Sequence, residues 1–304
     1  MIKGMQEVID VMTKAKADLD KNGGLKQVIF VACGGSFASS YPARFLLNQE
    51  SSLRVQGYNS SEFVNATPKN VDKNTLVIGT STKATAETVE ALKVAKEKGA
   101  VTVGLSGYAD SLTAQTADYY ITYYHADEWY KDPTLVHYNS QGTALKIAFW
   151  LLKEYDNYEA YDKALEGFEK LETIYGKAYT DVRAEAAKFA MTYKDDTVWN
   201  VMSSGAAWEV SYSDAFCFFQ EMQTVHCVPI HSGEYFHGAF ETCDKDLAIL
   251  LFKSIGRTRP VDERVAEYFN SLLFHPISKQ FISAMADVRM HPMTYRRYMW
   301  KFDY

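Results

Sequence analysis

One local pattern, which occurs twice, most constrains how this chain folds. The apolar run 27–32 ends at a Cys-Gly-Gly-Ser turn, residues 33–36, and the apolar run 198–202 ends at a Ser-Ser-Gly turn, residues 203–205. Each turn leads into a predicted helix. A strand, a turn of small or hydroxyl-bearing residues and a helix N-terminus together form a site for an anion. The repetition predicts a duplicated fold built around a phosphorylated small molecule.

The overall composition excludes several classes of protein. The 304 residues suggest about two domains, and a content of 47% apolar and 23% charged residues is typical of a soluble globular protein. The net charge is −6 and no cluster of Lys and Arg is dense enough to follow a nucleic-acid backbone. No apolar run approaches the roughly 18 residues of a membrane span, and the N-terminus has no signal pattern. The four scattered cysteines favour free thiols in a cytoplasmic protein, without a metal site.

Predicted strands and helices alternate along both halves, which indicates an α/β fold with parallel sheets in three layers. We expect a first subdomain over 1–137, a helical connector of two long helices over 138–195, and a second subdomain over 196–304. The second half looks one strand short between Tyr268 and Phe274. The predicted strands are 28–32, 53–57, 76–79, 101–105, 119–122, 198–202, 225–229 and 247–252, and the predicted helices outside the connector are 2–19, 37–48, 84–98, 206–220, 261–269 and 278–290.

Two turns are candidates for binding a phosphate group. In the turn 33–36, glycines allow the backbone to approach an anion, although a purely structural turn is about as common. The segment 79–85 is more informative, because four of its seven residues carry hydroxyls and a simple helix cap needs only one. Neither a Walker loop nor a dinucleotide-binding glycine pattern is present. The candidate binding residues are Gly34, Gly35, Ser36, Thr80, Ser81, Thr82 and Thr85.

Two residues of the second half are candidates for acid–base chemistry. Glu221 closes an otherwise apolar helix, and His237 lies sixteen positions later in a Gly-Glu-Tyr-Phe-His-Gly segment, residues 233–238. We expect Glu221 at the carboxyl edge of the second sheet, where open α/β sheets bind ligands. A carboxylate in partly apolar surroundings and an imidazole are suited to moving protons near neutral pH. A solvated glutamate and a structural histidine are the alternatives.

Together these segments resemble the sugar isomerase (SIS) domain family over nearly the whole chain. Residues 33–36 match its CGxS turn, residues 80–88 its SxSGxTxxT loop, and residues 218–221 and 233–238 its KxKE and GExxHG segments. The resemblance is to the isomerase portion of glutamine–fructose-6-phosphate transaminase and, as a stand-alone double-SIS chain, to fructosamine 6-phosphate deglycases. Lys83 replaces the glycine of the loop, Phe219 and Gln220 replace basic residues, and the amidotransferase half is missing.

The resemblance implies hydrolysis of a 6-phosphofructosyl amino acid, such as fructoselysine 6-phosphate, to glucose 6-phosphate and a free amino acid. His237 would open the sugar ring, and Glu221 would move a proton from C1 to C2. No metal or redox cofactor is implied. In the family the catalytic histidine comes from a neighbouring subunit, so a homodimer or higher homo-oligomer with shared active sites is expected.

Other functions remain open from the sequence. A ketose–aldose isomerase or a glucosamine-6-phosphate deaminase would use the same glutamate. A non-catalytic sugar-phosphate sensor would need only the phosphate loops, but no segment of helix-turn-helix size precedes Ile29. The sequence does not select the amino acid that the sugar carries. Candidate segments for binding the amine are the loop 127–138 and the pair Arg296 and Arg297.

Overall fold

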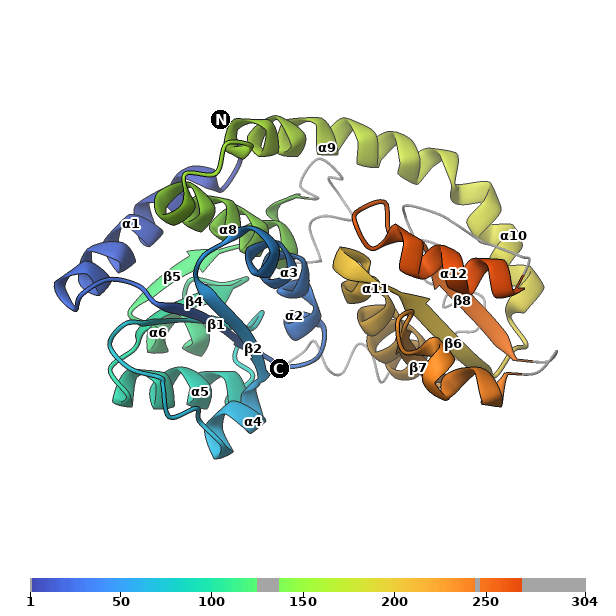
Figure 1. Ribbon diagram of the computed structural model, residues 1–304, viewed down its shortest axis with the longest axis horizontal. Helices are drawn as coiled ribbons and strands as arrows, with labels where there is room; N and C mark the ends of the chain where they lie inside the picture. The colour runs from blue at the N-terminus through green and yellow to red at the C-terminus, as the bar shows by residue number, and fades with distance from the viewer. Residues whose placement is uncertain (1, 125–136, 244–246, 270–304) are drawn as a thin grey trace. The chain divides into compact units, whose positions relative to one another are not determined.

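The protein contains two α/β units, each with its own parallel sheet (Figure 1). The computed structural model describes residues 2–124, 137–243 and 247–269. The chain divides into the units Met1–Gly176 and Lys177–Tyr304. The α/β fold predicted from the sequence is confirmed.

Three helices, and not the two expected, connect the halves of the chain. They are α8 (Ser140–Asp156), α9 (Tyr161–Asp181) and α10 (Arg183–Tyr193). The boundary between the units falls inside α9. The apolar side chains of α8 pack in the core of the first unit and those of α10 in the core of the second. The outer two of these helices therefore contribute to the cores of the units that they join.

The first unit contains a five-stranded parallel sheet with the order β2-β1-β3-β4-β5. All five strands predicted for this half are present. Strands β1, β3 and β4 are buried along their whole length, as expected for the central strands of a parallel sheet covered on both faces. The strands are β1 (Gln27–Ala32), β2 (Arg54–Asn59), β3 (Thr75–Thr80), β4 (Val101–Ser106) and β5 (Tyr119–Thr122).

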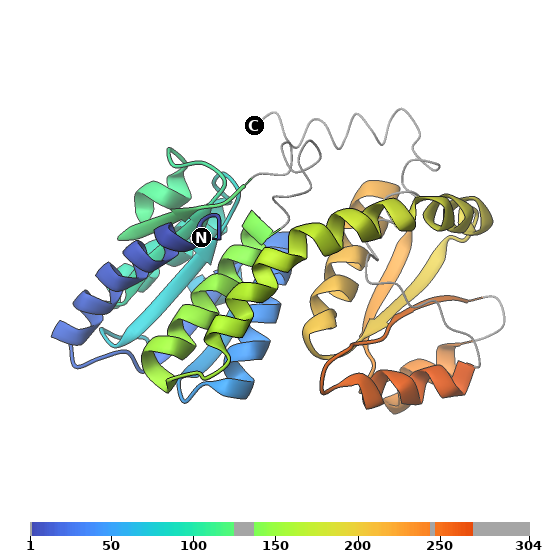
Figure 2. The same cartoon turned by 90° about the horizontal axis from the view of Figure 1, so that it is seen from above.

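Successive side chains of β1 enter two separate cores, one on each face of this sheet. Val28 and Phe30 pack with α1, α3 and α8, whereas Ile29 and Val31 pack with α4 and α5. Helices α1 and α8 run side by side (Figure 2). This is the predicted three-layer arrangement. The helices are α1 (Met5–Lys21), α2 (Gly34–Ser39), α3 (Tyr41–Glu50), α4 (Ser60–Asn65), α5 (Ala86–Glu97) and α6 (Leu112–Thr116).

One helix expected in the first unit is broken in two. The predicted helix 37–48 forms as α2 and α3, which meet at Ser40. Pro42 lies in the first turn of α3, where its missing N–H costs nothing and its ring disfavours continuation of the preceding helix. The short helices α4 and α6 were not expected from the sequence.

The described part of the second unit contains a three-stranded parallel sheet with the order β7-β6-β8. Its strands are β6 (Val198–Ser203), β7 (His226–His231) and β8 (Ala248–Phe252). One face is covered by α10 and the π-helical segment η3 (Asp214–Glu221), the other by η4 (Tyr235–His237) and α12 (Arg259–Phe269). The predicted helix 278–290 and the stretch beyond Phe269 lie outside the described residues.

The predicted helix 206–220 forms as three segments of different geometry, 3₁₀, α and π. A short turn, η2 (Gly205–Ala207), leads into α11 (Trp208–Ser213), and the chain then continues as η3. π-Helical segments are rare in proteins, and those that occur are often found at functional sites. The candidate base Glu221 is the last residue of this segment.

All four cysteines are free thiols. Among the helices of the described residues, none is long and apolar enough to cross a membrane.

Candidate active site

The two predicted phosphate-binding turns follow neighbouring strands of the first sheet. Strands β1 and β3 pair in parallel, with Val31 opposite Gly79. From β1 the chain moves to β2 on one side, and β3 lies on the other side. In open α/β sheets the crevice at such a reversal of strand order, beyond the carboxyl ends of the strands, is the usual ligand-binding position. The structure therefore brings the turn 33–36 and the loop 80–85 together at this position.

The turn after β1 leaves open space above a glycine. Cys33 is extended, and Gly34 follows with a left-handed φ of +53°. A Cβ atom placed on Gly34 would meet nothing within 4 Å. Gly34 and Gly35 are exposed and Ser36 is half-buried. A backbone of this kind can approach a ligand without obstruction from side chains.

The hydroxyls of the loop after β3 have two different roles. Thr80 and Ser81 are each 2% exposed. The Ser81 Oγ accepts a hydrogen bond from the Thr85 backbone N–H and lies 2.9 Å from the Thr85 Oγ1. Ser81 therefore shapes the loop from beneath, while the half-buried Thr82 and the exposed Thr85 are the hydroxyl residues that a ligand can reach.

Lys83 occupies the position where the family has glycine, and it needs no unusual backbone. Among the described residues other than glycine, only Asn157 and Thr224 have a positive φ. Lys83 is half-buried, and its Nζ lies 5.9 Å from the centre of the Tyr108 ring. The substitution therefore adds a cation beside the hydroxyl loop without requiring left-handed backbone.

The turn after β6 in the second unit has the same backbone geometry as the turn 33–36, but a side chain occupies the space above its glycine. Its central strand β6 is flanked by the next two strands just as β1 is, which confirms the predicted duplication. Ser204 is extended and Gly205 has a φ of +56°, close to the values at Cys33 and Gly34. Here, however, a Cβ on Gly205 would clash with the side chain of Thr258, and the Ser204 Oγ donates to the Thr258 carbonyl at 3.2 Å.

A buried carboxyl group is a second difference between the turn after β6 and the turn after β1. Asp262 is fully buried, and its Oδ2 accepts a hydrogen bond from the Ser254 backbone N–H at 2.8 Å, just after β8. An acidic group at this position opposes the binding of an anion. The open turn of the first unit, and not its copy, is thus suited to phosphate.

Glu221 lies at the amino edge of the second sheet, so its expected place at the carboxyl edge is wrong. Strand β7 is parallel to β6, and the helical crossover must return the chain to the amino edge before β7 begins. The Gln220 Nε2 accordingly donates to the Cys227 carbonyl at 2.6 Å, and the Phe219 ring packs on Trp199 near the start of β6. The Glu221 side chain is exposed beside this apolar contact.

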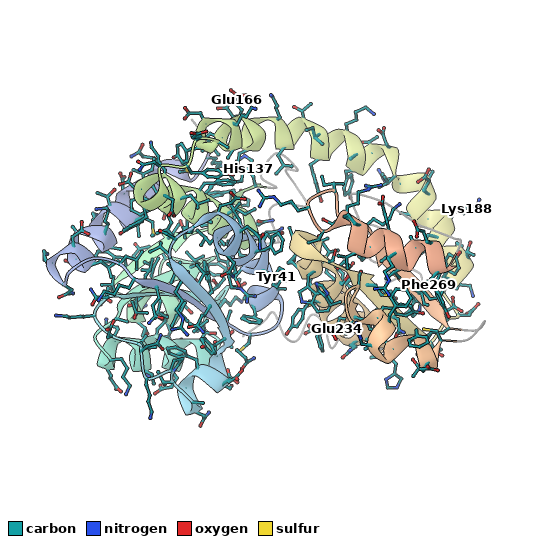
Figure 3. All side chains as sticks on the ribbon, in the orientation of Figure 1. Tyr41, His137, Glu166, Lys188, Glu234 and Phe269 are labelled. Atoms are coloured by element: carbon teal, nitrogen blue, oxygen red, sulfur yellow. The ribbon has the colours of Figure 1, made fainter. Side chains whose placement is uncertain are left out.

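His237 lies in the other crossover of the second unit. It is the exposed last residue of η4, and its backbone N–H donates to the Glu234 carbonyl at 3.0 Å. The adjacent Tyr235 is fully buried against α12, with its ring 5.4 Å from that of Phe269. Glu234 and Phe269 are labelled in Figure 3.

The segments that carry Glu221 and His237 pack on opposite faces of the second sheet. Phe219 belongs to the core shared with α10, and Tyr235 to the core shared with α12. The sheet therefore lies between the two segments. Their proton-transfer roles and the substrate contacts of the first unit remain predictions.

Tyr123 of the first unit is a candidate site residue that the sequence did not suggest. Tyr123 follows β5, two strands away from the hydroxyl loop, and its hydroxyl donates to the Thr82 Oγ1 at 3.1 Å. The sequence signal that could have identified Tyr123 is its position two residues after Ile121, which puts both side chains on the same buried face at the carboxyl end of a strand. Of the proposed amine-binding candidates, residues 127–136, Arg296 and Arg297 lie outside the described residues.

Comparison with known proteins agrees with this architecture. Residues 25–149 match the model of the SIS domain. The fructosamine deglycase FrlB of Bacillus subtilis (strain 168) is 32% identical over 93% of this chain and 94% of its own length. The fructoselysine 6-phosphate deglycase of Escherichia coli (strain K12) is 24% identical over 83% of this chain and 71% of its own. A Salmonella typhimurium LT2 protein described as a phosphosugar isomerase superposes with a TM-score of 0.90 at 32% identity, covering 99% and 97% of the two chains.

These matches define the class of protein. The chain belongs to the SIS-domain family. Its relatives include the fructosamine deglycase FrlB of Bacillus subtilis over nearly the full length of both chains. The resemblance inferred from the turn 33–36, the loop 80–88 and the segment 233–238 is confirmed.

Proposed function

We propose that this protein is a deglycase that hydrolyses a 6-phosphofructosyl amino acid to glucose 6-phosphate and a free amino acid. The observation that carries the proposal is the match to the fructosamine deglycase FrlB, at 32% identity over 93% of this chain. The open turn beside the hydroxyl loop, at the reversal of strand order in the first sheet, supports a phosphorylated substrate. The protein acts in the cytoplasm, where its four free thiols stay reduced.

The phosphate group binds in the first unit. Backbone at Gly34 and Gly35 and the hydroxyls of Ser36, Thr82 and Thr85 surround its oxygens. The N-terminus of α5, which begins directly after Thr85, favours the negative charge. The net charge of the chain is −6, so local donors and the nearby Lys83 must hold the anion against an unfavourable overall field.

The chemistry consists of proton transfers. His237 opens the sugar ring by moving a proton at the ring oxygen. Glu221 removes a proton from C1 of the open-chain ketoamine and returns it to C2. The C2 carbonyl oxygen gains a proton and becomes an alcohol, the amine nitrogen loses its proton, and an imine is left at C1. Water adds to this imine, and the C–N bond breaks to release the amine and the aldehyde of glucose 6-phosphate. Each general acid–base step contributes about 10²–10⁴-fold.

Two copies of the chain build each site. Within one unit the second sheet separates the segment of Glu221 from that of His237. This separation supports a homodimer, or a higher homo-oligomer, in which the histidine acts on the substrate held by a neighbouring copy. Such a symmetric assembly contains two equivalent sites per pair of chains.

Ketose–aldose isomerisation is a second candidate. It is favoured by the likeness to the Salmonella protein described as a phosphosugar isomerase, at 32% identity. It needs the same transfer of a proton between C1 and C2 but breaks no C–N bond.

A substrate panel separates these functions. Purified protein is incubated with 6-phosphofructosyl conjugates of lysine, aspartate, glutamate and other amino acids, with glucosamine 6-phosphate and with fructose 6-phosphate, and the products are separated by liquid chromatography. A deglycase releases glucose 6-phosphate and the free amino acid in equal amounts. Turnover of fructose 6-phosphate alone, or release of ammonia from glucosamine 6-phosphate alone, would contradict the proposal.

The two left-handed glycines give a matched test of where phosphate binds. Gly34→Ala places a methyl group in open space, so stability should fall only by the backbone strain of about 1–2 kcal/mol. The methyl blocks the approach of the phosphate to the backbone, and the loss of charge-assisted hydrogen bonds should raise KM about tenfold or more.

Gly205→Ala is the matched control, since its φ of +56° is nearly that of Gly34. Its methyl clashes with Thr258, so the loss of stability should be larger by about 1–3 kcal/mol, with KM unchanged. KM and the denaturant midpoint are measured for both variants. A Gly34→Ala enzyme with the parental KM would show that phosphate binds elsewhere.

A further inference from the structure

Tyr123 connects the far side of the first sheet to the hydroxyl loop. It follows β5 directly, and its backbone N–H donates to the Ser106 carbonyl at 3.0 Å, at the end of β4. The side chain is 6% exposed, and its hydroxyl donates to the Thr82 Oγ1 at 3.1 Å, just beyond β3. Tyr123 thus spans the carboxyl ends of three adjacent strands and ends on one of the hydroxyls predicted to bind phosphate.

The direction of this hydrogen bond determines whether the Thr82 hydroxyl can donate a hydrogen bond to a ligand. A threonine hydroxyl has one hydrogen and two lone pairs. Because Tyr123 donates to the Thr82 oxygen, the Thr82 hydrogen must point to another acceptor. The carbonyl of Thr82 is already occupied by donors, the Ser106 Oγ at 3.0 Å and the Gly107 N–H at 3.0 Å. The loop backbone and one lone pair of the hydroxyl are therefore held from below, and the hydroxyl hydrogen is left for another acceptor.

Tyr123 keeps this role at every pH at which a cytoplasmic enzyme works. Burial, with a smaller contribution from the nearby Tyr108, raises the pKa of the Tyr123 phenol to about 12, although its hydrogen bond to Thr82 acts in the opposite direction. The group is therefore a protonated donor, and it never competes with a phosphate oxygen as an anion.

We propose that Tyr123 is a positioning residue that turns the Thr82 hydroxyl into a donor aimed at a phosphate oxygen of the substrate. The inference rests on the proposed function, because it presumes that a sugar phosphate binds at this loop. A phosphate dianion has only hydrogen-bond acceptors. A hydroxyl that is already fixed as a donor therefore binds it more tightly than a freely rotating hydroxyl, which loses rotational entropy on binding.

The test is a double-mutant cycle of Tyr123→Phe and Thr82→Val. Tyr123→Phe removes one hydroxyl from a buried ring, and KM for fructoselysine 6-phosphate should rise about fivefold to tenfold, the effect of one hydrogen bond. Turnover at saturation should stay close to that of the parent. In the Thr82→Val background the same change should have no further effect on KM, because Tyr123 acts through the Thr82 hydroxyl. KM reports only folded molecules, so partial unfolding would lower the apparent kcat and leave KM unchanged.

Tyr155→Phe is the matched control. The Tyr155 hydroxyl is also buried, in α8, and it has no hydrogen-bond partner within the described part of the chain. Its removal should leave KM at the parental value.

Calorimetric binding of glucose 6-phosphate and of inorganic phosphate separates the possible failures. A parent protein that binds neither would overturn both this inference and the proposed function. A parent that binds glucose 6-phosphate, with Tyr123→Phe binding it equally well, would overturn the positioning role alone. So would a Tyr123→Phe effect of the same size with and without the Thr82 hydroxyl.

Discussion

Replacing Glu221 by glutamine is expected to lower kcat for fructoselysine 6-phosphate by about a thousandfold, within the range for loss of a general base. The amide has nearly the shape of the carboxylate but cannot take a proton from C1 or return it to C2. Glu221 is the exposed last residue of η3, so the substitution leaves the core around Phe219 intact. KM should change little, because the proposed phosphate site lies in the first unit. Release of glucose 6-phosphate under saturating substrate measures the effect.

Glu267→Gln is a suitable control for this substitution. Glu267 is an exposed glutamate on α12 in the same unit, so the change in charge is identical. Its activity should match that of the parent. If Glu221→Gln retained activity within about tenfold of the parent, less than a general base contributes, the proton-transfer role of Glu221 would be excluded.

Replacing His237 by asparagine should lower kcat by about a hundredfold, as expected when an acid–base group is lost from ring opening. Asparagine keeps a hydrogen-bonding side chain but carries no titratable proton. The residue is exposed next to the buried Tyr235, so the melting temperature should stay near that of the parent. The predicted role is specific to the cyclic substrate, and the defect should shrink for an analogue that cannot close its ring.

His226 provides the corresponding control. It is an exposed histidine at the start of β7, and His226→Asn should retain parental turnover. A His237→Asn enzyme whose defect is equal for cyclic and open-chain substrates would contradict a role in ring opening.

The central strands of the first sheet were predictable from sequence because each is a short apolar run that ends at a turn. The runs 28–32, 76–79 and 101–105 correspond to β1, β3 and β4, which are buried on both faces. Such runs report burial directly. The helices were less predictable. The break at Ser40 depends on a single proline, and the π-helical geometry of η3 leaves no simple pattern in composition.

The arrangement of the candidate site was predictable where one segment contains all the relevant residues. The hydroxyl loop and the turn 33–36 are local motifs, and the structure places them on adjacent strands. Properties that depend on topology were not predictable in the same way. Glu221 was expected at the carboxyl edge, but the parallel pairing of β6 with β7 puts it at the amino edge. The filling of the second turn by Thr258 depends on a contact between residues 53 positions apart, which no local motif records.

We propose that Glu221 of one copy and His237 of another act on the same sugar phosphate. The most direct measurement is glucose 6-phosphate release by Glu221→Gln and His237→Asn chains, purified separately and as a mixed assembly after coexpression with different tags. A mixed dimer contains one site with both substitutions and one with neither. We expect each variant alone to be nearly inactive and the purified mixed dimer, which has one intact site of two, to show about half of the parental rate. A mixed assembly as inactive as its components would contradict it.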